Sequence, residues 1–341
     1  MKTSRHGGHR KGISRLSPEL VLPMVQPLPF IPEPFFDELL SSWLRRISAE
    51  YGMALNQLIE YLQLEASSRA SLDYREHPKD CRRIANALRI STKEVDTMTH
   101  KPLQGAGKQL LSWPFPIQVC RACDAFHRTQ TAQKVQLKGW FEYWTLECTA
   151  CRRSLSPLTG PKLKIANPQR EDPGWYSEVL THARHGASEV MRYARNPRFF
   201  AFSPLACLEL LSKRTGPLRF NAYKPNVKFR GILNPENHCI AELLIPGLSD
   251  KLDQSPLIPS RWRSDHPTKD VTARTLLLAA LALFLANPAS AWAKVQERIC
   301  YAKGVEIDFW LSRQSPHLAQ RLSPNSTRTK RAEHVSQLLQ L

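Results

Sequence analysis

The sequence lacks any apolar run long enough to cross a bilayer. Its most apolar stretch, Leu276–Ala286, is far shorter than the ~20 residues that a membrane-spanning helix needs. The positive charges near the amino end are not followed by the apolar segment of a secretory signal. We therefore expect no membrane partner and a cytoplasmic protein. The reducing conditions of that compartment argue against a disulfide framework.

Acidic residues are also scarce. The chain has 30 Asp and Glu against 48 Lys and Arg, which gives a formal net charge of +18. A positive field of this size attracts polyanions, of which nucleic acid is the commonest for such a protein. A charge that serves only solubility, or an acidic protein partner, is the alternative. We interpret the charge as a sign of nucleic acid, bound directly or within a nucleoprotein complex.

The few carboxylates are dispersed. A nuclease or recombinase needs clustered carboxylates for metal ions, or a Ser or Tyr nucleophile flanked by arginines. Glu33, Asp37 and Glu38 are close together, but they precede or begin one helix whose pattern is structural. Asp265 and His266 stand alone in a predicted turn. We predict that the protein is not an enzyme.

Eight cysteines are present, and half of them follow a pattern. Cys81, Cys207, Cys239 and Cys300 are scattered, and we expect them to be small buried apolar residues. The other four form two Cys-x-x-Cys pairs separated by 24 residues, namely Cys120, Cys123, Cys148 and Cys151. Four thiolates complete the tetrahedral shell of a zinc ion. The spacing favours one structural Zn²⁺ over an iron–sulfur cluster, a redox pair or a catalytic zinc.

The residues between the two pairs predict a small β structure. Gly139–Leu146 is rich in aromatic residues with high strand propensity. The distance between the pairs leaves room for two strands, and two intervening residues within each pair are typical of a tight turn. We therefore expect a zinc ribbon with four cysteine ligands over residues 111–165.

Helical periodicity precedes this module. A proline-rich lead-in at 27–34 is followed by apolar residues at helical spacing, a break at Tyr51–Gly52 and a second apolar stripe over Leu55–Leu62. This pattern predicts a helix-turn-helix, although a helical hairpin that serves only packing is the alternative. We expect Trp43 in the core and Arg45 and Arg46 as nucleic-acid or partner contacts. A weaker second hairpin over 83–95 has Ser91 as its expected cap.

The carboxyl-terminal half is also predicted to be helical. Helices are expected at Tyr176–Tyr193, Leu205–Leu211, Ala241–Leu252 and Val271–Leu285. Between them, residues 211–230 combine basic and aromatic residues without an acid, which suits a nucleic-acid backbone and its bases. The alternative is a basic loop whose aromatic residues pin it to the core. The predicted contact residues of this segment are Lys213, Arg214, Arg219, Lys224, Lys228 and Arg230.

Together these patterns predict a mostly α protein with a small β zinc ribbon. We divide it into a disordered basic arm (1–26), a helical helix-turn-helix domain (27–110), the zinc ribbon (111–165) and a C-terminal helical domain (166–341) that could bind DNA. Residues 101–119 contain Gly and Pro and have the composition of a linker.

The N-terminal pattern resembles the opening of TniQ-domain proteins of the TniQ/TnsD family. The positions that carry the resemblance follow the proline-rich lead-in and are Glu38, Ser42, Trp43, Arg46 and Gly52. A zinc ribbon downstream, with Trp140 eight residues before Cys148, agrees with the family pattern. Arg121 stands where the family often has proline, and Cys151 stands where it often has histidine. The further Cys-x-x-Cys that many members add shortly after the ribbon is missing. The resemblance covers residues 27–155.

The resemblance implies an adaptor that selects the target site in Tn7-like transposition. Its implied partners are DNA or an RNA-guided Cascade complex of a CRISPR-associated transposon, and an AAA+ ATPase regulator of the TnsC or TniB type. It also implies a homodimer in some settings and a nucleoid-associated location in a prokaryotic cell. The alternative function is a zinc-ribbon and helix-turn-helix transcription regulator that binds promoter DNA without the ATPase.

Overall fold

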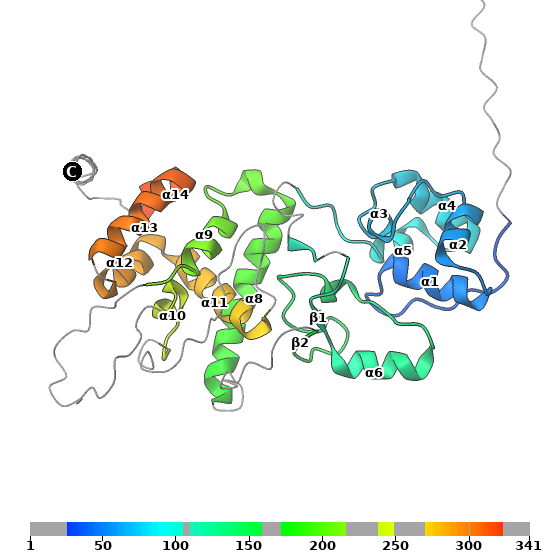
Figure 1. The fold of residues 1–341 in the computed structure, drawn as a ribbon, viewed down its shortest axis with the longest axis horizontal. Coiled ribbons are helices and arrows are strands. Elements are labelled where there is room, and N and C mark those ends of the chain that lie inside the picture. Colours follow the sequence, from blue (N-terminus) through cyan, green and yellow to red (C-terminus); the bar gives the residue numbers. More distant parts are fainter. Residues whose placement is uncertain are drawn as a thin grey trace, which may run out of the picture.

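The computed structural model describes residues 26–104, 110–112, 114–158, 172–215, 238–248, 270–299 and 301–322. Residues 1–25 of the expected basic arm, Cys300, and four predicted contact residues (Arg219, Lys224, Lys228 and Arg230) lie outside these ranges. The described chain is mostly helical with one small two-stranded sheet, as expected (Figure 1).

The N-terminal cluster lies at one end of the molecule (Figure 1). It consists of α1 (Leu40–Glu50), α2 (Leu55–Tyr61), α3 (Arg69–Asp73), α4 (Pro78–Leu88) and α5 (Thr92–Thr97). The apolar stripe of α1 is buried, with Trp43 at 1% exposure, so its prediction as a core residue is confirmed. Gly52 adopts a φ of +64° in the turn before α2, a conformation that glycine reaches without strain.

The second hairpin is formed by α4 and α5. Arg89 ends α4 with a φ of 53°, so an arginine holds the left-handed position that a glycine would hold more easily. The Ser91 hydroxyl accepts from the Glu94 backbone N–H at 3.1 Å, and the Glu94 carboxylate accepts from the Ser91 backbone N–H at 2.7 Å. This capping box confirms Ser91 as the cap of α5. Both helical pairs are therefore present, and groove binding by either one stays a prediction.

The start of α1 is capped from a distance. Leu39, at the N-cap position, has no side-chain oxygen to offer. Asp73 on α3 supplies the acceptors: its carboxylate receives the Ser41 backbone N–H at 2.8 Å and the Ser41 hydroxyl at 2.7 Å. Burial raises the pKa of Asp73 to about 6, against the opposing effect of these two bonds from Ser41. The free helix donors thus find their partners through tertiary packing.

The middle of the chain contains β1 (Gln118–Val119), α6 (Arg121–Gln130), the 3₁₀ turn η2 (Lys138–Trp140) and β2 (Ser156–Pro157). The strands pair antiparallel, with Gln118 opposite Pro157. Residues 101–119 are more than a linker, because Leu110 and Ile117 are buried with the C-terminal helices and the Gln104 backbone N–H donates to the Ala194 carbonyl at 2.8 Å. This segment fastens the middle of the chain to the C-terminal body.

The C-terminal body is helical and lies at the other end of Figure 1. Three of the four predicted helices appear with nearly the expected bounds. The helix expected at Ala241–Leu252 is shorter, because it ends at Leu244, before a turn at Gly247 with a φ of 73°. The elements are α8 (Pro173–Arg195), η3 (Pro197–Phe199), α9 (Pro204–Leu211), α10 (Ile240–Leu244), α11 (Val271–Ala286), α12 (Pro288–Arg298), α13 (Tyr301–Gln314) and α14 (Pro316–Leu322).

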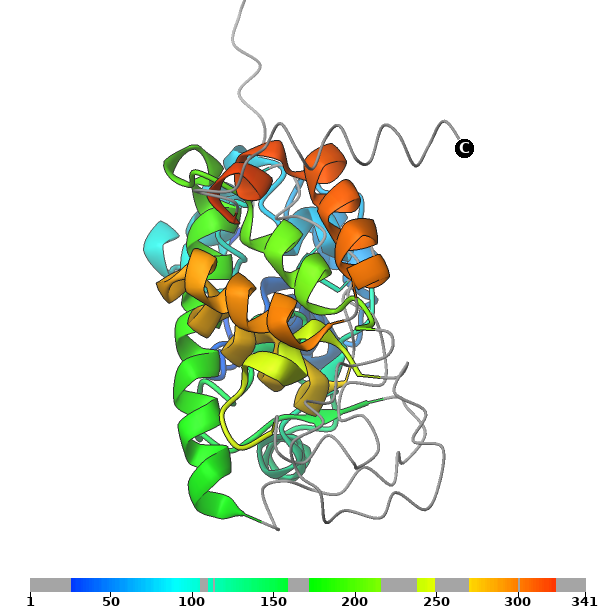
Figure 2. The ribbon, with the colours of Figure 1, turned by 90° about the vertical axis from the view of Figure 1, so that its left-hand side faces the viewer.

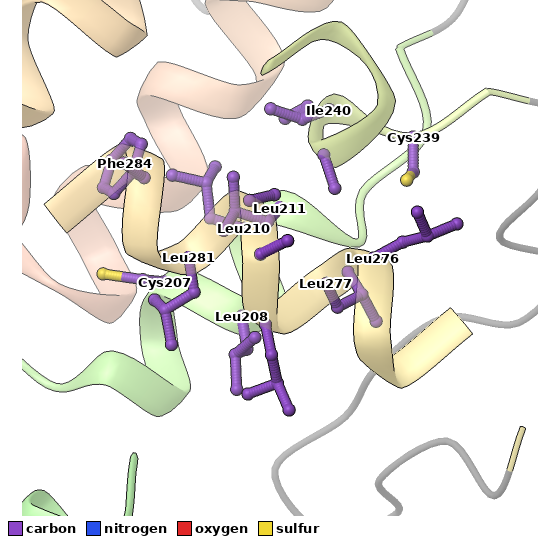
Figure 3. Close-up of a cluster of buried hydrophobic side chains, with 14 of the residues drawn as sticks. Cys207, Leu208, Leu210, Leu211, Cys239, Ile240, Leu276, Leu277, Leu281 and Phe284 are labelled. Carbon is purple, nitrogen blue, oxygen red and sulfur yellow. The ribbon is translucent and has the colours of Figure 1, made fainter. Parts of the chain in front are cut away.

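The apolar helix α11 forms the core of this body. Side chains of α9 and α10 pack against it, together with the buried Cys207 of α9 and Cys239, which directly precedes α10 (Figure 3). These two cysteines and Cys81 are buried, as predicted for the scattered thiols. Among the described helices none is by itself long and apolar enough to span a membrane, and α11 and α12, which pass such a test only together, are bent by 116°.

The long helix α8 runs along one side of the molecule (Figure 2) and packs against α11. Gly186 makes this contact possible. A Cβ at this position would lie 2.0 Å from the carbonyl oxygen of Leu278, far inside van der Waals contact. The two backbones therefore approach more closely than any side chain at residue 186 would allow.

We predict that Gly186→Ala destabilises the protein by about 3 kcal/mol or more, because the added methyl group collides with backbone that cannot rotate away. Thermal unfolding followed by circular dichroism measures this effect. Gly174→Ala on the same helix is the matched control, since its Cβ would meet nothing closer than 3.6 Å. We expect it to change stability by less than about 1 kcal/mol, in the favourable direction. Equal melting temperatures for the two variants would contradict the close crossing.

Candidate metal centre and the network that supports it

The four cysteines of the two Cys-x-x-Cys pairs meet at one point. The Sγ atoms of Cys120, Cys123, Cys148 and Cys151 all lie within 4.8 Å of one another. Cys120 and Cys151 are 3.4 Å apart, and Cys123 and Cys148 are 3.6 Å apart. Metal–sulfur bonds of about 2.3 Å in a tetrahedron place the sulfurs about 3.8 Å apart. The cluster therefore fits a single tetrahedral metal ion.

The local structure around the first pair differs from the expected tight turn. Cys120 is the N-cap residue of α6 and Cys123 lies in the first turn of that helix. The strand β1 ends at Val119 and delivers the chain directly to Cys120. A helix start brings residues three apart onto one face, so it aims both sulfurs in the same direction as a turn would.

The second pair lies in a tight turn. The Arg152 backbone N–H donates to the Cys148 carbonyl at 2.9 Å, and the Cys148 N–H donates to the Arg153 carbonyl at 2.8 Å. Arg152 takes a φ of 60° to close this turn. The chain then enters β2, whose pairing with β1 holds the two cysteine pairs next to each other.

The expected β structure does not form in the strand-prone segment Gly139–Leu146. This segment begins with the 3₁₀ turn η2, and only an isolated bridge at Glu142 has β geometry. The reason is Gln118, whose side-chain amide nitrogen lies 2.8 Å from the Gly139 carbonyl, 3.1 Å from that of Glu142 and 2.8 Å from that of Thr145. These carbonyls converge on one buried side chain and so cannot form a ladder.

Gln118 is held in turn from the C-terminal body. Its side-chain oxygen accepts a hydrogen bond from Nη2 of Arg274 on α11. Arg274 is fully buried, and that burial lowers its pKa to about 10. Within the described part of the chain its Nε and Nη1 have no hydrogen-bond partner. Sequence patterns did not indicate this arginine, because it lies within the apolar run of α11.

The surroundings of the four thiols change their pKa values in different directions. Burial is the main cause that raises the pKa of Cys123 and Cys148. For Cys151, burial is outweighed by hydrogen bonds from the Arg153 backbone and the neighbouring thiols, which lower the pKa. Four adjacent thiolates without a counter-charge would repel one another, whereas a bound cation stabilises all four. In the described residues no other group of three or more His, Cys, Asp or Glu side chains is arranged to hold a metal.

A buried ion pair joins Glu38, just before α1, to Arg46 within that helix. Arg46 and Glu38 form bonds of 3.1 Å from Nε to Oε1 and 3.0 Å from Nη2 to Oε2. The Glu38 carboxylate also accepts from the Ser42 hydroxyl at 2.9 Å and the Phe35 backbone N–H at 3.0 Å. Trp43 donates its indole N–H to the Pro32 carbonyl at 2.7 Å. The residues that carry the family resemblance are therefore structural.

This network joins the N-terminal cluster to the metal region. The Ser42 hydroxyl accepts from the Gln136 backbone N–H at 3.0 Å. Asp37, next to Glu38, accepts from the Thr149 hydroxyl at 2.7 Å and pairs with Lys138 at 3.1 Å. Thr149 lies between Cys148 and Cys151. The start of α1 thus touches both the loop before the second cysteine pair and the pair itself.

The predicted contact residues have different surroundings. Arg46 is 5% exposed and its guanidinium also donates to the Glu33 carbonyl at 2.5 Å, so the structure places it inside the domain rather than on a surface. Arg45 is half-buried and donates to the Lys134 carbonyl. The ammonium group of Lys213 lies over the ring of Trp310, 4.1 Å from its centroid. The backbone of Arg214 forms an isolated antiparallel β-bridge with that of Cys239. Nucleic-acid contact by Arg45, Lys213 or Arg214 stays a prediction.

The fold and the cysteine cluster define a helical protein with a four-cysteine module suited to a metal ion. Residues 29–157 match the TniQ family model, so this part of the chain, just over a third of its length, is a TniQ domain. The domain associates the chain with Tn7-like transposition. No curated protein and no solved structure matches the sequence significantly.

We predict that Arg46→Ala destabilises the N-terminal cluster by roughly 3–5 kcal/mol, because it leaves the Glu38 carboxylate buried and unpaired. Urea unfolding followed by tryptophan fluorescence measures the change. The control is Arg128→Ala, which removes an arginine from an exposed pair with Asp124 at 2.7 Å and should cost roughly 0–0.5 kcal/mol. If both variants unfold at the same urea concentration, the ion pair does not stabilise this region.

Proposed function

We propose that this protein is a target-selection adaptor in Tn7-like transposition. The observation that carries the proposal is the TniQ match over residues 29–157. That range includes both α1–α5 and the cysteine cluster, and the bonds of Asp37, Glu38 and Ser42 connect the two. An adaptor has to present two partners in a fixed relation, and a continuous buried network supplies such rigidity.

We propose that one Zn²⁺ occupies the cysteine cluster, with Cys120, Cys123, Cys148 and Cys151 as ligands. The sulfur-only donor set and the tetrahedral spacing support zinc, which prefers four thiolates in structural sites. The ion would supply folding stability rather than chemistry, because four sulfurs leave no open position for a substrate. This arrangement suits a protein that recruits enzymes and is not one.

The partners we propose are target DNA or an RNA-guided Cascade complex on one side and an AAA+ ATPase regulator of the TnsC or TniB type on the other. The net charge of +18 supports contact with a nucleic acid or nucleoprotein. Arg45 and the basic segment 211–230 are the proposed contacts, and a homodimer would double both surfaces. The C-terminal helical body would extend the surface offered to these partners.

We predict that Cys148→Ser lowers the zinc content from one ion per chain to near zero and lowers the melting temperature, because one lost thiolate opens the shell. Mass spectrometric metal analysis of the purified protein gives the stoichiometry. Cys81→Ser is the control, since Cys81 is buried in the N-terminal cluster away from the four ligands, and it should retain the full zinc content. A wild-type protein that folds without any metal would overturn the zinc assignment.

We predict that the full chain, loaded with zinc, links an ATPase of the TnsC or TniB type to DNA. A labelled duplex is mixed with the ATPase and ATP, with and without the chain, and complexes are separated on a native gel. We expect the ATPase to join the labelled species only when the chain is present. A second arm replaces the free duplex with DNA held by an RNA-guided complex, which distinguishes direct from guided targeting.

The controls for this experiment are ADP in place of ATP and the ATPase alone. If the chain binds a duplex sequence-specifically but never retains the ATPase in either arm, the adaptor function fails and the promoter-binding regulator is supported instead. If the chain retains neither DNA nor the ATPase, both functions are excluded.

A further inference from the structure

A surface that the sequence patterns did not single out lies where α8 turns into α9. Helix α8 ends at Arg195, and Pro197 prevents its continuation because proline lacks the backbone N–H and clashes with the preceding turn. The chain makes the short turn η3 and reaches α9 at Pro204. In Figure 1 this connection lies at the upper edge of the molecule, at the end of α8 opposite Pro173.

The turn points one aromatic ring into water and holds another in place. Phe199 is 83% exposed, more than any other large apolar side chain in the described ranges. The ring of Phe200 packs edge-on against Tyr193, with 5.4 Å between centroids, and Phe202 packs against the core of the C-terminal body. Phe200 and Phe202 anchor the connection, so Phe199 is held on the surface by a fixed backbone.

Three arginines lie close to Phe199 in the sequence, on the end of α8 and in η3. Residues 190–202 include Arg192, Arg195 and Arg198 and no acidic residue. Arg192 lies 4.8 Å from the ring centroid of Phe200 and pairs with Glu189 at 2.7 Å. Neither Arg195 nor Arg198 has a carboxylate within ion-pair distance among the described residues, and Nε of Arg195 is buried without a hydrogen-bond partner there.

Ordinary structural causes explain only part of this arrangement. Cations in the last turn of a helix interact favourably with its dipole, which accounts for Arg192 and Arg195. That effect does not reach Arg198, which lies beyond the helix end, and it gives no reason to expose Phe199. Single exposed apolar residues are common. Phe115 is an example, since it lies between two prolines and has no arginine next to it in the sequence. Phe199 differs because Arg198 directly precedes it and Arg195 lies before it in the last turn of α8.

We propose that the end of α8 together with η3 binds single-stranded nucleic acid. Phe199 stacks on an unpaired base, and Arg195 and Arg198 contact the phosphates on either side of it. Base stacking on an aromatic ring combined with backbone contacts by cations is how proteins hold single strands. The site lies outside residues 29–157, so it adds a contact that the TniQ domain does not account for.

The charge and the ring together favour nucleic acid over an acidic protein segment. An acidic segment would pair with the arginines but would leave the planar face of Phe199 in water. Single-stranded DNA and single-stranded RNA share the required chemistry, which is an unstacked base next to phosphates, and the experiment distinguishes them.

The test measures binding of the zinc-loaded full chain by fluorescence anisotropy. The probes are labelled oligothymidylate and oligouridylate about 12 nucleotides long, and the duplex of the former with oligodeoxyadenylate. The variants are Phe199→Ala and Arg198→Ala. The matched controls are Phe309→Ala and Arg313→Ala on α13. There Arg313 lies 4.6 Å from the centroid of the exposed Phe309 ring, but the nearby acidic residues Glu306 and Asp308 offset the positive charge.

We expect Phe199→Ala to weaken single-strand binding about tenfold, with an unchanged salt dependence, because stacking is lost and no charge is removed. Arg198→Ala should weaken binding and reduce the slope of log affinity against log salt by about 0.7, the value for one phosphate on a single strand. Both α13 controls should bind as the wild type does, within about twofold. All variants should melt as the wild type does, since the changed side chains are exposed.

A loss confined to oligothymidylate assigns DNA, a loss confined to oligouridylate assigns RNA, and a loss on both supports a site that accepts either. Wild-type affinity of Phe199→Ala for both single strands would overturn the proposal. So would an equal loss on the duplex, because a paired base offers no free face for stacking. A further probe is polyglutamate. If it binds the wild type and binds the same variants more weakly, the natural partner is an acidic protein and the proposal is overturned as well.

Discussion

The buried pair of Glu38 and Arg46 is the interaction on which the rest of the TniQ domain depends. Two charges removed from water are tolerated only when the geometry is good and the remaining lone pairs are used. Here the Glu38 carboxylate also accepts hydrogen bonds from the Ser42 hydroxyl and the Phe35 backbone N–H. The guanidinium of Arg46 lies over the ring of Phe35, 4.4 Å from its centroid. The pair thereby fixes the lead-in, the start of α1 and the contact with the metal region in one arrangement.

The cysteine cluster is supported by both the N-terminal cluster and the C-terminal body. On one side, Asp37 at the start of α1 holds Thr149 between the second pair of cysteines. On the other, Arg274 of the C-terminal body holds Gln118, two residues before Cys120. The cysteine module is thus the point where the N-terminal cluster and the C-terminal helices are fastened together. A metal ion that stabilises it would also stabilise the relation between the two ends of the molecule.

The buried polar groups of this architecture hold segments of the chain together. The buried polar groups serve positioning: Asp73 caps α1 and Gln118 gathers three carbonyls. At the end of α8 the surface instead presents cations and an aromatic ring. The bonds of the buried groups join segments that are far apart in the sequence into one rigid arrangement.

The sequence by itself determined the helical class, the grouping of four cysteines, the burial of Trp43 and the cap at Ser91, because periodicity, spacing and capping are local properties. Tertiary structure decided what depends on distant partners. Arg46 follows Arg45 in the sequence, but only the fold shows that it pairs with a buried Glu38. Gly139–Leu146 has strand propensity, yet Gln118 binds its carbonyls and bends it into a turn. Arg274 lies in an apolar run, and only the fold shows that it reaches Gln118 in a distant part of the chain. The arginines near Phe199 are visible in the sequence, but the exposure of its ring is decided by the fold.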